Sequence, residues 1–282
     1  MTTSSVADPR GAAGEPLGSY PGGKGSSGVA QRLINCIPPH RVLVVPFAGH
    51  CSVVRKIKPA EHTIVIDADE DVCQWWDSWR RTKQGRALEI HHADGIEWMR
   101  HRFGVTEYRP SSPAARSSDA GSRGGRPPLD PATCDRTSEY SASLQTFAFC
   151  DPPYVLSRRT GKQYAHEMSD DDHHRFVRTA SQITATGSTN MMICGYYSQI
   201  YNPLVSWRTF HHEVMTRGGL RTEWVWMNYA QSERLHDYRY LGSDRRERER
   251  IQRRQRNWRE QLLAMDNKER AAMLDALNSA KP

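Results

Sequence analysis

The fold is decided by the stretch Phe147-Ala148-Phe149-Cys150-Asp151-Pro152-Pro153-Tyr154. Its first four residues are apolar, as in a buried strand, and the prolines then end the strand because proline donates no backbone hydrogen bond. The turn leaves the Asp151 carboxylate and the Pro152 carbonyl able to converge on one amino group, beside the flat ring of Tyr154. We interpret the stretch as a site for a nucleobase taken out of its stack, rather than as an ordinary Asp-Pro turn.

Candidate strands and helices alternate along the rest of the chain. The strand candidates are 42–45, 63–66, 89–92, 147–150, 191–194, 209–214 and 223–227. Helices are expected over 71–81, over about 96–103 and over 171–186. This alternation predicts an α/β fold with a mostly parallel sheet covered by helices on both faces. Ligands of such sheets bind at the carboxyl ends of the strands, near the switch in strand order.

The composition narrows the class of protein. The 282 residues include 39 Lys and Arg against 32 Asp and Glu, a net charge of +7 that suits a nucleic-acid partner. No apolar stretch is long enough to span a bilayer or to form a signal-peptide core, so we expect no membrane association. The six cysteines contain no CxxC pair, which indicates reduced thiols in the cytoplasm.

Two stretches are too poor in apolar residues to form a core. Residues 1–18 and about 104–143 are rich in Gly, Pro, Ser and Arg, and we expect both to be disordered. The second stretch is then an insertion within one globular domain over 19–240. Residues 241–282 are expected to form a basic helical C-terminal extension.

Arginines dominate the C-terminal tail from Asp244 to Asn278, where basic helices are expected. Ile251, Trp258 and Leu262 fall on one face, together with Met265. The other faces carry the arginines, from which the candidate nucleic-acid contacts are Arg245, Arg246, Arg253 and Arg254. Two interpretations remain open: a solvated helix docked by its apolar stripe, or a helix that contacts phosphates.

Polar or glycine-containing loops follow three of the predicted strands. Gly49, in Pro46-Phe47-Ala48-Gly49, permits a tight turn and a close approach of a ligand to the backbone. Asp67 is placed to accept hydrogen bonds from ribose hydroxyls, and Asp69 to cap the next helix. Asp94 can accept from an adenine amino group or cap the helix that follows, and both alternatives remain open.

A glycine-rich segment near the N-terminus reads Tyr20-Pro21-Gly22-Gly23-Lys24-Gly25-Ser26-Ser27. It lacks the spacing of a Walker A loop, but one aromatic ring and one cation suit a small anionic or zwitterionic ligand. The paired histidines elsewhere match no metal-ligand spacing, so we predict no metal.

In their order along the chain, these motifs resemble the Dam-like, phage- and restriction-associated adenine-N6 DNA methyltransferases. The order is YPGGK at 20–24, PFAGHCSV at 46–53, a strand-final aspartate at 67, ADG at 93–95, DPPY at 151–154 and CGYYS at 194–198. Further matches lie at 164–168, at His173 and at 223–229. The resemblance runs from Tyr20 to the C-terminus and is interrupted by the 104–143 stretch.

The resemblance implies a Rossmann-like fold of the S-adenosylmethionine-dependent methyltransferases, with S-adenosylmethionine (SAM) as methyl donor. It implies that Phe47 and Gly49 line the SAM site and that Asp67 holds the ribose hydroxyls. The family pattern also assigns Asp94 to the adenine amino group of SAM. Tyr20 and Lys24 would close over the methionine end.

The resemblance further implies that Asp151, Pro152, Pro153 and Tyr154 form the catalytic site for the target adenine, with Asp151 also bordering SAM. The expected protein is a monomeric, site-specific enzyme that flips an adenine out of double-stranded DNA. We expect it in the cytoplasm, at the nucleoid of a bacterial or phage-infected cell, with a restriction enzyme encoded nearby. Two alternatives are an RNA adenine-N6 methyltransferase and a catalytically silent DNA-binding protein on the same scaffold.

The chain departs from the family where the target sequence should be read. The family usually places its target-recognition region between the ADG and DPPY motifs, which here enclose the low-complexity stretch. Base reading is then expected from 155–168, from the Arg-rich tail, or from the insertion once it orders on DNA.

Overall fold

The computed structural model describes residues 24, 28–81, 87–105, 145–158, 161, 164–216 and 219–279. The predictions for residues 1–18, for Tyr20 and for 106–143 therefore lie outside the described residues. By their internal contacts, the described residues form two compact units. The first contains His40–His50 and the residues from Pro59 to Ala230, and the second contains the remainder. The expected boundary at residue 240 stays a prediction.

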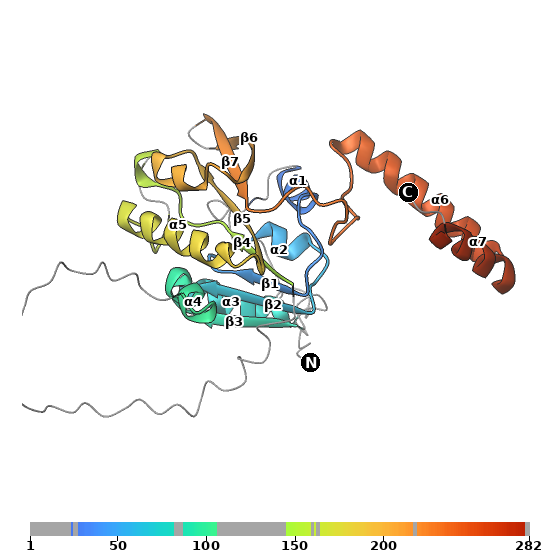
Figure 1. The fold of residues 1–282 in the computed structure, drawn as a ribbon, viewed down its shortest axis with the longest axis horizontal. Coiled ribbons are helices and arrows are strands. Elements are labelled where there is room, and N and C mark those ends of the chain that lie inside the picture. Colours follow the sequence, from blue (N-terminus) through green and yellow to red (C-terminus); the bar gives the residue numbers. More distant parts are fainter. Residues whose placement is uncertain are drawn as a thin grey trace, which may run out of the picture. The chain divides into compact units, whose positions relative to one another are not determined.

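A seven-stranded sheet forms the first unit (Figure 1). Its strands are β1 (Val42–Val45), β2 (His62–Asp67), β3 (Leu88–His92), β4 (Thr146–Cys150), β5 (Thr189–Tyr196), β6 (Arg208–Thr216) and β7 (Gly219–Met227). The order across the sheet is β3-β2-β1-β4-β5-β7-β6. Strands β1 to β5 pair in parallel, and β7 runs antiparallel to both of its neighbours. Every predicted strand is confirmed: β1 has the predicted bounds, and the other six strands are slightly longer than predicted.

Three helices belong to the first unit: α3 (Glu70–Arg80), α4 (Gly95–Arg102) and α5 (Asp170–Ala185). All three were predicted from the sequence. Short 3₁₀ turns at Leu156–Arg158 and Gln199–Leu204 were not. Figure 1 shows α5 lying along β4 and β5.

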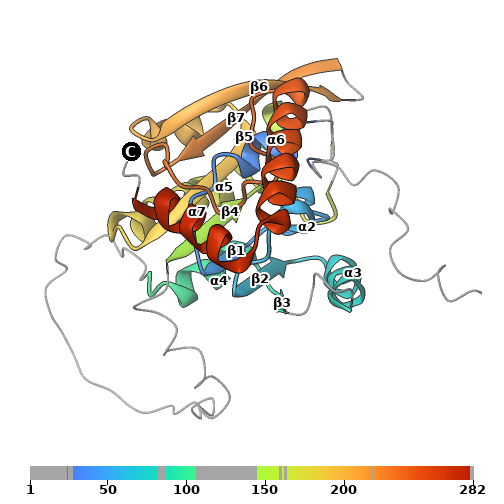
Figure 2. The ribbon, with the colours of Figure 1, turned by 90° about the vertical axis from the view of Figure 1, so that its right-hand side faces the viewer.

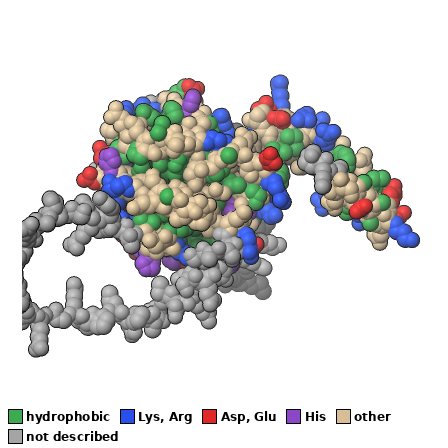
Figure 3. Space-filling model, viewed as in Figure 1, with side chains coloured by type: hydrophobic (Ala, Val, Ile, Leu, Met, Phe, Trp, Pro, Cys, Tyr) green, Lys and Arg blue, Asp and Glu red, His purple; other side chains and the backbone are tan. Residues whose placement is uncertain are grey.

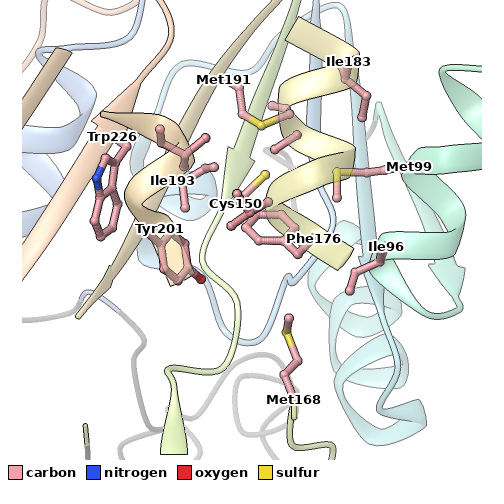
Figure 4. Close-up of a cluster of buried hydrophobic side chains, with 14 of the residues drawn as sticks. Ile96, Met99, Cys150, Met168, Phe176, Ile183, Met191, Ile193, Tyr201 and Trp226 are labelled. Carbon is pink, nitrogen blue, oxygen red and sulfur yellow. The ribbon is translucent and has the colours of Figure 1, made fainter. Parts of the chain in front are cut away.

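The main hydrophobic core lies between α4, α5 and one face of the sheet. Phe176 of α5 is fully buried in a cluster with Cys150 and Met99, and Figure 4 shows these side chains together. Leu43 and Phe149, whose side chains point to the other face of the sheet, are also buried. Both faces of the sheet are therefore covered. A parallel sheet needs this cover because its strands are apolar on both sides.

The α/β prediction is confirmed, because the first five strands have the Rossmann order 3-2-1-4-5. The added hairpin places β7 between β5 and β6, and Figure 2 shows β6 and β7 side by side.

The second unit contains the helices α1 (Val29–Ile34), α2 (Ser52–Lys56), α6 (Arg245–Ala264) and α7 (Asn267–Ser279). Helix α1 was not predicted. Asp237, which is buried, accepts from the Lys58 backbone N–H at 2.8 Å and from the Arg239 guanidinium at 2.7 Å. The bond from Lys58 joins two segments of the unit that lie far apart in the sequence, and the bond from Arg239 balances the charge of Asp237 locally.

The helical C-terminal extension predicted from the composition consists of two helices in the structure, α6 and α7. Met265 has an extended ψ of 150°, which ends α6. Asp266 then accepts from the backbone N–H groups of Lys268 and Glu269, which is the bonding of a helix N-cap. The short polar side chain of Asp266 favours a new helix start over continuation, and Figure 2 shows the bend between α6 and α7. None of the helices in the described part of the chain is both long and apolar enough to cross a membrane.

Candidate functional site

The switch in strand order lies between β1 and β4. From β1 the chain proceeds outward to β2 and β3, whereas from β4 it proceeds the opposite way to β5. The loop that leaves β1 carries Phe47 and Gly49, and the loop that leaves β4 carries Asp151. Since β1 and β4 are paired and parallel, both loops start from the same edge of the sheet. This is where ligands bind in open α/β sheets.

The Gly49 turn is held from both sides. Its N–H donates to Asp67 Oδ2 at 2.8 Å, and its carbonyl accepts from the indole N–H of Trp76 at 2.7 Å. Gly49 has a positive φ of 41°, which favours glycine. The buried Trp76 of α3 therefore fixes the loop that was expected to line a cofactor, a role that sequence reasoning missed. The sequence signal was the cluster of tryptophans in this helix.

Asp67 is partly a structural residue. Besides Gly49, it accepts from the Asp69 N–H at 2.9 Å through Oδ1. Burial raises the pKa of the Asp67 carboxyl, and the two backbone hydrogen bonds partly offset that effect. A carboxylate has about four lone-pair positions, so Asp67 keeps the capacity to accept from further hydroxyls. Asp69 caps α3 as predicted, accepting from the Asp71 N–H at 3.0 Å.

Asp94 caps α4. Its Oδ1 accepts from the backbone N–H groups of Ile96 and Glu97, at 2.9 and 2.8 Å. The capping alternative is therefore confirmed. The contact to the adenine of SAM stays a prediction for this exposed carboxylate.

Gly95 is confined by the loop after β1. A Cβ at this position would lie 2.0 Å from the carbonyl oxygen of Pro46 and 3.1 Å from the ring of Phe47. Phe47 in turn packs edge to face on Phe176, with ring centroids 5.4 Å apart. The glycine of the ADG motif thus allows α4 to begin directly against the Pro46-Phe47 turn.

The DPPY stretch leaves β4 as predicted. Pro152 and Tyr154 are buried, whereas Asp151 and Pro153 are half-buried. The Tyr154 hydroxyl donates to Glu223 Oε1, and Asp151 Oδ1 lies 3.2 Å from the same hydroxyl. Burial and the neighbouring carboxylates raise the pKa of Tyr154 well above its ordinary value, so the hydroxyl keeps its proton.

The Tyr154 ring is enclosed. Only 7% of the residue is exposed, and its ring centroid lies 4.5 Å from that of Tyr196. Stacking of Tyr154 on a target base stays a prediction. It requires the side chains that enclose the Tyr154 ring to move aside. The contact between Tyr154 and Glu223 was not predicted from the sequence, although Glu223 begins the 223–229 motif that resembles the family.

The remaining predicted residues that the structure describes belong to the second unit. Lys24 belongs to the second unit, where it is buried and has a positive φ of 50°. The four candidate arginines all lie exposed on α6, and Arg245 pairs with Glu249 at 2.8 Å. Within the part of the chain that the structure describes, no group of three His, Cys, Asp or Glu side chains is arranged to hold a metal ion.

No family model and no curated protein matches the chain. Several solved structures are similar in fold. An rRNA methylase from Streptococcus thermophilus is 7% identical with a TM-score of 0.40, and the match covers 72% of this chain and 95% of that one. TrmN from Thermus thermophilus is 12% identical with a TM-score of 0.39, covering 71% and 47%.

Human methyltransferase-like protein 13, in complex with SAH, is 13% identical with a TM-score of 0.38, covering 73% and 82%. Because these identities and TM-scores are low, the fold assignment rests on the strand order of the sheet and not on these similarities.

Proposed function

We propose that this protein is a SAM-dependent methyltransferase that methylates the exocyclic N6 amino group of an adenine in double-stranded DNA. One observation carries the proposal: Asp151 follows β4 on one side of the switch point, and the Gly49 turn follows the neighbouring strand β1 on the other side. Asp67 holds that turn by accepting from the Gly49 N–H. A cofactor at the Gly49 turn would present its methyl group toward the loop that carries Asp151. We further propose that the protein acts as a monomer in the cytoplasm.

The chemistry requires little more than orientation. The adenine amino nitrogen is a poor nucleophile because its lone pair is delocalised into the ring. Asp151 and the Pro152 carbonyl accept its two N–H bonds, which favours a pyramidal nitrogen with an available lone pair. When bound, SAM would supply an electrophilic methyl group on a sulfonium, so no metal is needed. The proton on the amine becomes acidic after transfer and leaves toward Asp151.

Cofactor affinity is expected to depend on pH through Asp67. The carboxylate accepts the ribose hydroxyls better than the protonated acid, and burial raises the pKa of this group. SAM binding should therefore weaken as the pH falls through that raised pKa, at a higher pH than for an exposed aspartate. Calorimetric titration of SAM at a series of pH values measures this dependence.

Two substitutions check that assignment. Asp67→Asn should weaken SAM binding and remove its pH dependence. Asp69→Asn is the matched control, because asparagine caps a helix as well as aspartate, so affinity at neutral pH should stay as in the native protein. The pH dependence should persist but move to lower pH, because the charge of Asp69 contributes to the raised pKa of Asp67. An unchanged pH profile in Asp67→Asn would refute the role of Asp67.

Helix α6 supports a contact with DNA phosphates. Arg246, Arg250, Arg253 and Arg254 recur at helical spacing, and Figure 3 shows Lys and Arg side chains gathered along this helix. No residue of α6 is buried, so these guanidinium groups extend into solvent. Each phosphate contact contributes about −0.9 to the slope of log K against log salt.

Replacing Arg253 and Arg254 with alanine should weaken DNA binding and flatten that salt dependence by about 1.8, if each arginine neutralises one phosphate. Fluorescence anisotropy over a salt series measures both quantities. A variant carrying Glu260→Gln on the same helix is the control and should not flatten the slope. A double variant with the native slope would exclude these arginines from phosphate contact.

Duplex DNA and duplex RNA of matched sequence, incubated with the protein and labelled SAM, test the substrate class. N6-methyladenine in the digested DNA, found by mass spectrometry, is the expected result. Methylation of RNA alone would establish the alternative, an RNA adenine-N6 methyltransferase. That alternative exists because the proposed contacts of the DPPY loop are to the adenine base, which DNA and RNA share. Absence of methyl transfer to any duplex or single strand would refute the proposed function.

A further inference from the structure

The β6–β7 hairpin extends beyond the neighbouring strand β5. Strand β5 ends at Tyr196, which is opposite Glu223 of β7. Among the described strands, residues 219–222 of β7 pair with residues 213–216 of β6 alone, and we call these two segments the outer hairpin. Four residues of a strand span about 13 Å. Because β7 is antiparallel to β5 and β5 is parallel to β4, the outer hairpin continues past the edge of the sheet that carries the candidate site, and Figure 2 shows it at the upper right.

The outer hairpin starts directly at the candidate target-adenine site. Glu223, where β7 begins to pair with β5, accepts a hydrogen bond from the Tyr154 hydroxyl and is 2% exposed. Side chains two residues apart on a strand point to the same face and are about 7 Å apart. Arg221 is therefore the next side chain outward on the face that carries Glu223, beside the position proposed for the flipped adenine.

Arg221 is placed to bind an anion. It is exposed, and its cross-strand neighbour Val214 carries no charge. Arg221 makes no ion pair with any residue that the structure describes. A guanidinium group binds phosphate through two parallel hydrogen bonds, and phosphates are the anions that flank every nucleotide.

Two large apolar side chains occupy the other face of the outer hairpin. Met215 and Leu220 are opposite each other in the strand register and are 72% and 55% exposed. Each is an odd number of residues from its Arg221 or Val214 counterpart, so the pair points away from the Arg221 face. Apolar side chains that pair at a projecting end are suited to contact a partner.

The shape of the outer hairpin favours the major groove of a DNA duplex. The major groove, about 12 Å wide, admits a two-stranded ribbon, whereas the minor groove is only about 6 Å wide. The N6 amino group of adenine also faces the major groove. That groove presents thymine methyl groups on its floor and phosphates along its rims, which match an apolar pair on one face of a ribbon and a guanidinium on the other.

We propose that the outer hairpin is a DNA-binding ribbon that enters the major groove beside the target adenine. Arg221 binds a backbone phosphate, and Met215 and Leu220 contact thymine methyl groups. This inference rests on the proposed function, since the duplex is that of the proposed substrate. It gives the chain a base-contacting element that the sequence analysis did not predict.

Arg221→Ala should weaken binding to a DNA duplex and flatten the slope of log K against log salt by about 0.9, the effect of one phosphate contact. Fluorescence anisotropy over a salt series measures both quantities. Arg178→Ala is the matched control, because it removes one exposed arginine from α5, and it should keep the native slope. Melting temperatures identify any variant that has lost its fold. A native slope in Arg221→Ala would overturn the phosphate contact.

The apolar pair is tested with an alternating adenine–thymine duplex and the same duplex carrying deoxyuridine, which lacks the methyl group. The native protein should bind the thymine duplex more tightly, roughly fourfold for each methyl group buried. Met215→Ser combined with Leu220→Ser should bind both duplexes equally and keep the native salt slope. Val205→Ser is the control: Val205 is 86% exposed outside the hairpin, so the preference for thymine should persist.

Two results would overturn the contact with thymine. One is equal affinity of the native protein for the two duplexes. The other is a native dimer, seen by sedimentation without DNA, that dissociates in the double serine variant, because a second copy of the chain would then cover the apolar pair.

These binding measurements need no turnover, so the inference and the proposed function fail separately. Duplex binding that depends on Arg221 and on thymine, without any methyl transfer, would refute the proposed function and leave the DNA-binding ribbon. Methyl transfer to adenine in DNA, with a native salt slope in Arg221→Ala and no preference for thymine, would refute the ribbon and leave the proposed function.

Discussion

Replacing Asp151 with alanine is expected to abolish methyl transfer while leaving SAM binding largely intact. The carboxylate accepts an N–H bond of the adenine amino group, and this bond strengthens as the nitrogen becomes tetrahedral. Removing one such transition-state contact costs about 10²–10³ in rate, and loss of the proton acceptor adds to that effect. Single-turnover transfer from labelled SAM, together with the dissociation constant of SAM, measures the two properties separately.

The asparagine variant refines that test. Asp151→Asn keeps the shape of the side chain, but it presents an N–H group where the substrate also has N–H bonds, so a large loss is again expected. Asp171→Ala, an exposed residue of α5, is the control for removal of an aspartate and should transfer methyl groups at the native rate. Undiminished transfer by Asp151→Ala would exclude the proposed mechanism.

The second large effect is expected at Gly95. A methyl group there would lie 2.0 Å from the Pro46 carbonyl oxygen, which is backbone and cannot rotate away as a side chain can. Gly95→Ala must push α4 from the loop that carries Phe47. Overpacking typically costs about 1–3 kcal/mol, and a backbone clash belongs at the upper end. Denaturant unfolding should show this loss, and SAM binding should weaken because the loop moves.

Gly187→Ala provides the comparison. Gly187 has a positive φ of 70°, but a Cβ there would meet no atom within 4 Å. This variant should lose only the cost of a left-handed backbone, about 1 kcal/mol, and should bind SAM as the native protein does. Equal losses in the two variants would show that the Pro46 contact does not confine Gly95.

The sequence predicted the strands and caps well because these features are local. Apolar runs report a buried strand, and Asp69 and Asp94 accept from N–H groups only two or three residues away. The tail was predicted to be helical because its composition is helical throughout, but composition does not show where one helix ends and the next begins. The break at Asp266 depends on a side-chain cap that composition alone does not reveal.

The sequence alone determined that Asp151 follows a buried strand and lies beside two prolines and a tyrosine. Only the tertiary structure decided what lies next to Tyr154. Glu223 is 69 residues away in the sequence, and it reaches the tyrosine because β7 inserts between β5 and β6. Local sequence patterns indicate the secondary structure of a segment and the side chains that satisfy its backbone hydrogen bonds. The neighbours of a buried side chain depend instead on strand order and register, which are set by packing between distant segments.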